Sequence, residues 1–251
     1  MSDNTKRFSD RVDNYIKYRP SYPLEAVDYI FKSFNLTNES SIADIGSGTG
    51  ILTKLLAPRC AAVYAVEPNT EMRLAAERLL KDIKSFISVD GTAEETELKD
   101  KSVDCVIAAQ AFHWFDRQKV KPEFGRILKD NGRVILIWNK RKLSTDFQIN
   151  YEEIIKNDIP EYKQVNHHQI TPEIIRGFMP VEYKLEKFSY TQRFDWNGMI
   201  GRLQSSSYCP KPETGTFKRI EAKLRIIFDK YQTGGTVPFI YETEVYSGKF
   251  F

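Results

Sequence analysis

A short apolar strand followed at once by three closely spaced glycines is the feature that most limits how this chain folds. Residues 42–50 read Ile-Ala-Asp-Ile-Gly-Ser-Gly-Thr-Gly. Glycine adopts the positive φ angles of a sharp strand-to-helix turn, and its missing Cβ lets a ligand approach the backbone. The stretch therefore predicts a buried strand, a ligand-binding turn and a helix over 49–57.

The spacing of these glycines indicates which ligand the turn binds. A dinucleotide-binding turn has a glycine at the sixth position, where this chain has Ile51, and no Gly-Lys-Ser/Thr follows to make a phosphate-binding loop. Asp44, two residues before the first glycine, would repel a pyrophosphate but attract an ammonium group. We therefore expect a nucleoside-like ligand that carries a cation and lacks phosphate.

Apolar runs after the glycines predict an α/β fold. Most of the runs are separated by segments with helical spacing, and they lack strict alternation, which is typical of parallel strands covered on both faces. Parallel strands are expected at 42–44, 62–67, 85–90, 103–109 and 133–139.

The last third of the chain has a different pattern. Residues 181–190 and 237–245 alternate apolar and polar side chains, which predicts an antiparallel pair of strands, with a bulge at 186–187 where the alternation changes phase. The polar segment 196–216 between them is expected to cover the site as a lid. The whole chain, 1–251, is interpreted as one domain with an N-terminal helical arm (1–35), a ligand-binding core (36–140) and a C-terminal part with a cap (141–251).

Composition and charge disfavour several classes of protein. The formal net charge is +3 with acids and bases spread along the chain, so nothing signals a nucleic-acid partner. The three cysteines are far apart, which disfavours a disulfide framework or a metal site and suits a reducing compartment. Without a membrane-length apolar run or a signal-peptide pattern, we expect a soluble, cytoplasmic protein with no membrane partner. The oligomeric state stays open.

Polar residues follow each predicted parallel strand, at the edge where open α/β sheets bind ligands. Glu67 ends the second strand, where a carboxylate can accept hydrogen bonds from two ribose hydroxyls. Residues 90–94 follow the third strand and 110–115 follow the fourth. Together with the glycine turn, these positions predict a nucleoside-binding edge.

These four segments, over about residues 40–140, resemble the successive motifs of the class I S-adenosylmethionine-dependent methyltransferases. A narrower resemblance, carried by 15–23, 109–115, 205–208 and 243–246, is to a bacterial and fungal branch that includes relatives of yeast trans-aconitate methyltransferase. The resemblance implies a Rossmann-like, seven-stranded, mostly parallel sheet with an antiparallel C-terminal strand and helices on both faces. It also implies S-adenosyl-L-methionine as methyl donor and S-adenosyl-L-homocysteine as product.

The resemblance further implies roles for single residues. Asp44 would fix the amino group of the donor, Glu67 the ribose hydroxyls, and Tyr15 with Arg19 would close over it, Arg19 as a carboxylate partner. His113 is the catalytic candidate, although a packed, hydrogen-bonded histidine is an equally good interpretation. The other implied cofactor contacts are Gly46, Ser47, Gly48, Pro68, Met72, Thr92, Ala93, Glu94 and Gln110.

Three functions remain open at this stage. The favoured one is O- or N-methylation of a small molecule by direct in-line transfer, because the lid-sized insert suits a small acceptor. Methylation of RNA or protein is the alternative, although Ala-Gln-Ala-Phe at 109–112 lacks the Asn/Asp-Pro-Pro-aromatic sequence of amino-methylating nucleic-acid enzymes. The third is a catalytically silent protein that binds S-adenosylmethionine.

Overall fold

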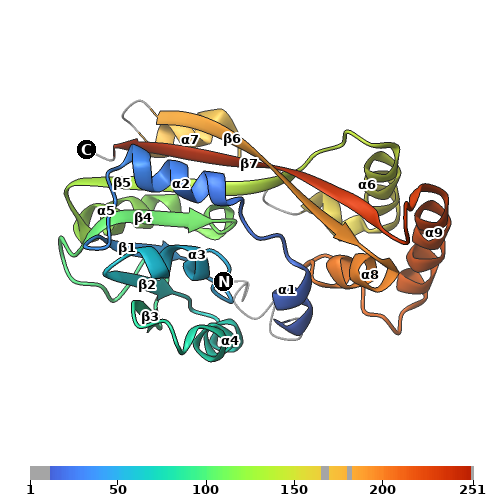
Figure 1. The fold of residues 1–251 in the computed structure, drawn as a ribbon, viewed down its shortest axis with the longest axis horizontal. Helices are drawn as coiled ribbons and strands as arrows, with labels where there is room; N and C mark the ends of the chain where they lie inside the picture. The colour runs from blue at the N-terminus through green and yellow to red at the C-terminus, as the bar shows by residue number, and fades with distance from the viewer. Residues whose placement is uncertain (1–11, 165–169, 180–182, 250–251) are drawn as a thin grey trace.

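The computed structural model describes residues 12–164, 170–179 and 183–249. In this part of the chain one seven-stranded sheet has the order β3-β2-β1-β4-β5-β7-β6 (Figure 1). The first five strands are mutually parallel, and β7 runs antiparallel to both β5 and β6. This confirms the predicted fold. The strands are β1 (Ser41–Ile45), β2 (Ala62–Val66), β3 (Phe86–Val89), β4 (Val103–Ala109), β5 (Leu128–Arg141), β6 (Tyr183–Phe194) and β7 (Val237–Lys249).

Helices cover both faces of this sheet and connect its strands. Several begin at a side-chain cap: the side-chain Oδ1 of Asn69, for example, accepts a hydrogen bond from Met72 N at 2.9 Å at the start of α4. The α-helices are α1 (Val12–Tyr18), α2 (Leu24–Ser33), α3 (Thr53–Leu56), α4 (Thr70–Leu80), α5 (Arg117–Ile127), α6 (Asp146–Asp158), α7 (Pro172–Phe178), α8 (Trp196–Gln204) and α9 (Gly215–Tyr231), and short 3₁₀ turns are η2 (Ala57–Arg59), η3 (Phe112–Trp114) and η4 (Pro160–Gln164).

Alternate residues of the central strands supply two hydrophobic cores. Ile107 of β4 and Ile135 of β5 face α2 and α3, while their neighbours Val106 and Leu136 face α5 and α7; all four are fully buried. Because both faces of these strands are covered, their sequences are apolar throughout, as expected for parallel strands.

A third core lies beyond the edge of the parallel strands. Tyr151 of α6, Leu203 of α8, Leu224 of α9 and Phe239 of β7 belong to it. Figure 1 shows β6 and β7 running from the sheet to these helices, with α1 beside α8. We call α6, α8, α9 and the ends of β6 and β7 that pack against them the helical lobe. All of its elements come from the C-terminal part, 141–251, whose role as a cap stays a prediction.

Three local predictions were wrong. The register of β6 with β7 is continuous, so there is no bulge at 186–187; the phase changes because Tyr183 packs on the α7 face and Phe188 on the α2 face. The strand expected at 133–139 begins earlier, at Leu128, and its first pairings with β4 are irregular. The helix expected from residue 49 begins at Thr53, because the glycine turn continues to Gly50. In the described ranges, no helix combines the length and apolarity that a membrane crossing requires.

Candidate functional site

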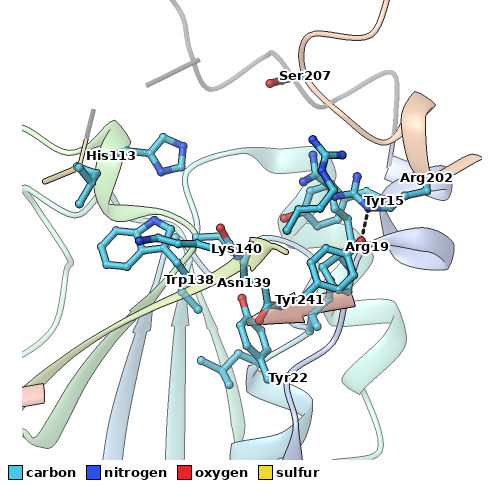
Figure 2. Close-up of a pocket in the computed structure, with 18 of the residues that line it drawn as sticks. Tyr15, Arg19, Tyr22, His113, Trp138, Asn139, Lys140, Arg202, Ser207 and Tyr241 are labelled. Carbon is cyan, nitrogen blue, oxygen red and sulfur yellow. Dashed lines mark hydrogen bonds between the residues drawn. The ribbon is translucent and has the colours of Figure 1, made fainter. Parts of the chain in front are cut away.

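A pocket of about 490 Å³ opens between the sheet and the helical lobe (Figure 2). The ends of β1, β4 and β5 form its core side, and α8 with the loop that follows it forms its lobe side. The parallel strands bring together residues that are far apart in sequence. The predicted residues that line it are Tyr15, Arg19, Asp44, Gly46, Ser47, Gln110 and His113.

The glycine loop has the conformation that its sequence predicts. Gly46, Gly48 and Gly50 have φ angles of 69°, 58° and 79°. The carbonyl oxygen of Val66 accepts hydrogen bonds from the loop, including one from Gly46 N at 2.9 Å, so the loop is fastened to β2. A Cβ on Gly46 would lie 2.5 Å from the Cβ of Ala111. Position 46 therefore requires glycine for its backbone angle and for space.

Glu67, at the end of β2, also holds this loop. Its Oε2 accepts a hydrogen bond from Gly48 N and its Oε1 one from Asn69 N, both at 2.8 Å. Burial raises the pKa of the carboxyl group, although the two N–H donors act in the opposite direction. Each carboxylate oxygen has a second lone pair, so Glu67 can hold the loop and also accept a ligand hydroxyl.

Asp44, at the end of β1, is a buried carboxyl group with unused hydrogen-bonding capacity. It is 1% exposed, and its Oδ2 accepts a hydrogen bond from Thr53 Oγ1 at 2.6 Å. Its Oδ1 has no partner among the described residues. Burial raises the pKa of Asp44 to about 6. A cation beside Oδ1 would satisfy this oxygen and lower that pKa again.

The N-terminal arm contributes Tyr15 and Arg19 to the pocket. The Arg19 guanidinium lies 4.9 Å from the centre of the Tyr15 ring and donates two hydrogen bonds to the carbonyl oxygen of Ser205, at 2.7 and 3.2 Å. Burial and the nearby Arg202 lower the pKa of Arg19. The arm is thus joined to the helical lobe by an arginine whose hydrogen-bond acceptor is neutral.

Gln110 and His113 follow β4 on the core side of the pocket. Gln110 has a φ of 59°, an uncommon angle for a residue with a side chain, and its N–H donates to Ile137 O at 2.9 Å. The His113 ring centre is 4.8 Å from that of Trp114. Burial, with a smaller contribution from Arg19, lowers the pKa of His113 to about 4. The imidazole is therefore neutral at pH 7 and a weak base.

Comparisons with known proteins agree with this geometry. The model of a family described as a methyltransferase domain matches residues 43–136. An uncharacterised methyltransferase of Mycobacterium tuberculosis is 36% identical over 178 residues, which cover 67% of this chain and 70% of that protein. The chain belongs to the S-adenosylmethionine-dependent methyltransferases.

Two further relatives extend the match. A Saccharomyces cerevisiae protein, named as an S-adenosylmethionine-dependent methyltransferase, is 35% identical over 125 residues, 47% of this chain and 42% of its own length. A structure described as a candidate type II methyltransferase from Anaeromyxobacter dehalogenans has a TM-score of 0.67 at 19% identity, covering 93% of this chain and 98% of that one. The similarity to the Anaeromyxobacter dehalogenans structure shows the fold of this methyltransferase.

The residues of the pocket fit the methyl donor of this family. The unpartnered Oδ1 of Asp44 suits the ammonium of its methionyl part, and Arg19 suits its carboxylate. A Cβ on Gly48 would meet only Tyr15, at 3.9 Å, so the loop leaves room for a ligand against its backbone. These features fit the donor, and the contact assigned to each single residue of the methyltransferase stays a prediction.

The other predicted residues do not line this pocket. Met72 is buried in α4, and the Thr92 hydroxyl accepts a hydrogen bond from Glu95 N at 3.0 Å. A carboxylate oxygen of Glu94 accepts one from Asp116 N at 2.7 Å, next to the start of α5. Their contacts with adenine therefore stay a prediction. The described residues of this group are Gly48, Glu67, Pro68, Met72, Thr92, Ala93 and Glu94.

Sequence reasoning missed much of the lining of the methyltransferase pocket, on the lobe side and at the end of β5. Residues 139–141 continue β5 past its apolar run, and a fifth strand end at the same edge is a signal that could have found them. The lobe residues gave no such signal, because helical spacing does not show which face of α8 meets the pocket. The missed residues include Tyr22, Trp138, Asn139, Lys140, Arg141, Glu152, Tyr162, Arg202, Ser207, Tyr208 and Tyr241.

Proposed function

We propose that this methyltransferase transfers a methyl group from S-adenosylmethionine to an oxygen or nitrogen of a small molecule. The observation that carries the proposal is the pocket itself, which the helical lobe covers on the side away from the sheet. Its volume of about 490 Å³ falls within the range of about 300–1,000 Å³ that is usual for small-molecule sites. A lobe in this position favours a small acceptor over a nucleic acid or a folded protein.

Methyl transfer depends more on the positioning of donor and acceptor than on acid–base groups. S-adenosylmethionine supplies an electrophilic methyl group on a sulfonium, and the acceptor atom must be held about 3–3.5 Å from that carbon, in line with sulfur. The glycine loop and Asp44 would hold the donor, and Gln110 and His113 border the space beside it. A carboxylate acceptor needs no base, whereas an amine or phenol must lose a proton, for which His113 is the candidate.

The test is to measure release of S-adenosylhomocysteine with a panel of small acids, phenols and amines, using the full chain. Turnover of at least one class is the expected result. Activity on RNA or protein alone would contradict the proposal, as would tight S-adenosylmethionine binding with no turnover in cell extract. The relationship to the trans-aconitate methyltransferase branch and a cytoplasmic site of action belong to the same proposal.

A further inference from the structure

Arg202 on α8 is a buried cation in the lobe side of the pocket (Figure 2). It is 7% exposed, and no carboxylate of the described residues pairs with it. Its Nε donates to the Tyr241 hydroxyl at 3.1 Å, and its Nη1 to the hydroxyls of Ser206 at 3.1 Å and Ser205 at 3.3 Å. Its Nη2 donates to no described residue. Neutral oxygens therefore orient the guanidinium without compensating its charge.

Arg141, at the end of β5, is a second guanidinium of the same pocket. Its Nη2 lies 2.6 Å from Glu152 Oε2 and 3.2 Å from the Tyr162 hydroxyl. Its Nε is buried without a partner among the described residues. Glu152 also accepts a hydrogen bond from the Tyr162 hydroxyl at 2.6 Å and lies 3.6 Å from Lys156 Nζ. One carboxylate is thus shared by two cations.

The described residues that line the pocket carry more positive than negative charges. Asp44 and Glu152 are the acids of this lining. The proposed donor would bring an ammonium for Asp44, a carboxylate for Arg19 and a positive sulfonium. Lys140 has its own partner outside the lining, Glu244 at 2.6 Å. Buried charges are costly unless they are paired. The cations of the described lining are Arg19, Lys140, Arg141, Lys156 and Arg202.

The pKa of Tyr208 is shifted in the direction that this excess of positive charge predicts. Burial raises the pKa of this tyrosine, but Arg141 and Arg202 outweigh the burial, and the net shift is downward. Tyr208 lines the pocket at its lobe end. A negative group placed there is therefore favoured by the surrounding field.

We propose that Arg202 and Arg141 form an anion-recognition subsite for the methyl acceptor, which is a small molecule carrying an oxyanion, a carboxylate or a phosphate. The unused Nη2 of Arg202 supplies the direct hydrogen bond, and the guanidinium geometry suits either oxyanion. The inference rests on the proposed function, because it names the class of acceptor for the same pocket.

The first test uses the unaltered protein saturated with S-adenosylhomocysteine. Calorimetric titration with succinate and with inorganic phosphate measures whether an oxyanion binds and which source is preferred. We expect at least one of them to bind, and succinamide to bind at least about 10-fold more weakly than succinate, because it lacks the charge. Equal binding of succinate and succinamide would overturn the inference, as would no binding of either anion.

The second test uses variants in the same titration. Arg202→Gln is expected to weaken anion binding about 10- to 100-fold, the range for a hydrogen bond to a charged group, and Arg202→Lys to weaken it less. Arg219→Gln is the matched control, because this arginine lies on α9 of the same lobe with its side chain 58% exposed. Thermal unfolding of each variant shows that it is folded.

The outcomes separate this inference from the proposed function. Arg202-dependent anion binding without methyl transfer to any small molecule supports the subsite and contradicts the function. Methyl transfer to neutral acceptors and acids alike supports the function and overturns the subsite. If Arg202→Gln weakens S-adenosylhomocysteine binding and leaves anion binding unchanged, Arg202 belongs to the donor site and the inference falls.

Discussion

The Glu67 carboxylate and the backbone N–H of Gly48 are joined by a hydrogen bond of 2.8 Å, which ties the end of β2 to the glycine loop. The bond spans 19 residues of sequence, and the second oxygen of Glu67 accepts from Asn69 N at the start of α4. One buried side chain therefore sets the positions of a loop and a helix. A carboxylate suits this place because it only accepts hydrogen bonds, and both neighbours are donors.

Replacing Glu67 by alanine is expected to weaken binding of S-adenosylhomocysteine by roughly 1.5–3 kcal/mol, the scale for a hydrogen bond to a charged group. Two buried N–H groups would also lose their acceptor, so we expect lower stability in urea unfolding. Calorimetry with S-adenosylhomocysteine and its 2′,3′-dideoxy analogue separates the two effects. If the variant and the unaltered protein discriminate equally between these ligands, Glu67 holds the loop but does not contact the ribose.

Asp44→Asn is expected to stabilise the free protein above pH 7. The pKa of Asp44 is raised from 3.8 to about 6 in the folded chain, so burying its ionised form costs up to about 3 kcal/mol. This cost is absent below about pH 4, grows between pH 4 and 6, and is complete above about pH 6. Urea unfolding at pH 4 and pH 8 measures it. A gain of stability that is equal at both pH values would contradict the assignment.

The same carboxyl group predicts how ligand binding depends on pH. Asp44 must be ionised to hold an ammonium group, so the affinity for S-adenosylhomocysteine should fall as the pH drops below about 6. Asp44→Asn should bind more weakly at pH 8 and lose most of this dependence. Asp130→Asn, an exposed site with its side chain 78% accessible, is the control that should keep the profile of the unaltered protein.

His113→Ala should leave the affinity for S-adenosylhomocysteine nearly unchanged, because none of the predicted donor contacts involves this side chain. If His113 acts as a base, kcat should fall about 100-fold or more with amine or phenol acceptors and little with carboxylates. With a pKa of about 4, it should cause no change in rate near pH 6.5. Full turnover of every acceptor class by the variant would remove the proposed role.

The parallel half of the fold was predictable from sequence because each of its determinants is local. A strand buried on both faces is apolar throughout, and Gly46 and Gly48 occupy positions with positive φ. Since parallel strands end at one edge, Asp44, Gln110 and His113 could be assigned to one pocket without coordinates. The structure brings these three together in that pocket.

The lobe side of the pocket was not predictable, because nonlocal packing determines it. The hydroxyls of Tyr241 on β7 and Ser206 after α8 accept hydrogen bonds from Arg202 and orient it towards the pocket. No local sequence pattern near Arg202 predicts either hydrogen bond. The bulge expected in β6 was wrong for a related reason. Tyr183 and Phe188 lie on opposite faces of a regular strand, and α7 packs against the face of Tyr183 while α2 packs against the face of Phe188.

Gly201→Ala is expected to weaken ligand binding from a position that does not line the pocket. A Cβ at residue 201 of α8 would lie 2.0 Å from the ring of Tyr18 in α1, so the two helices must separate. The overlap should cost about 1–3 kcal/mol in unfolding free energy. Because Tyr15 and Arg19 lie at the pocket end of the same arm, affinity for S-adenosylhomocysteine should fall as well. Gly177→Ala, where an added Cβ has no neighbour within 4 Å, is the matched control. If Gly201→Ala lowers stability but leaves ligand affinity at the level of the control, the packing of α1 on α8 does not position the arm.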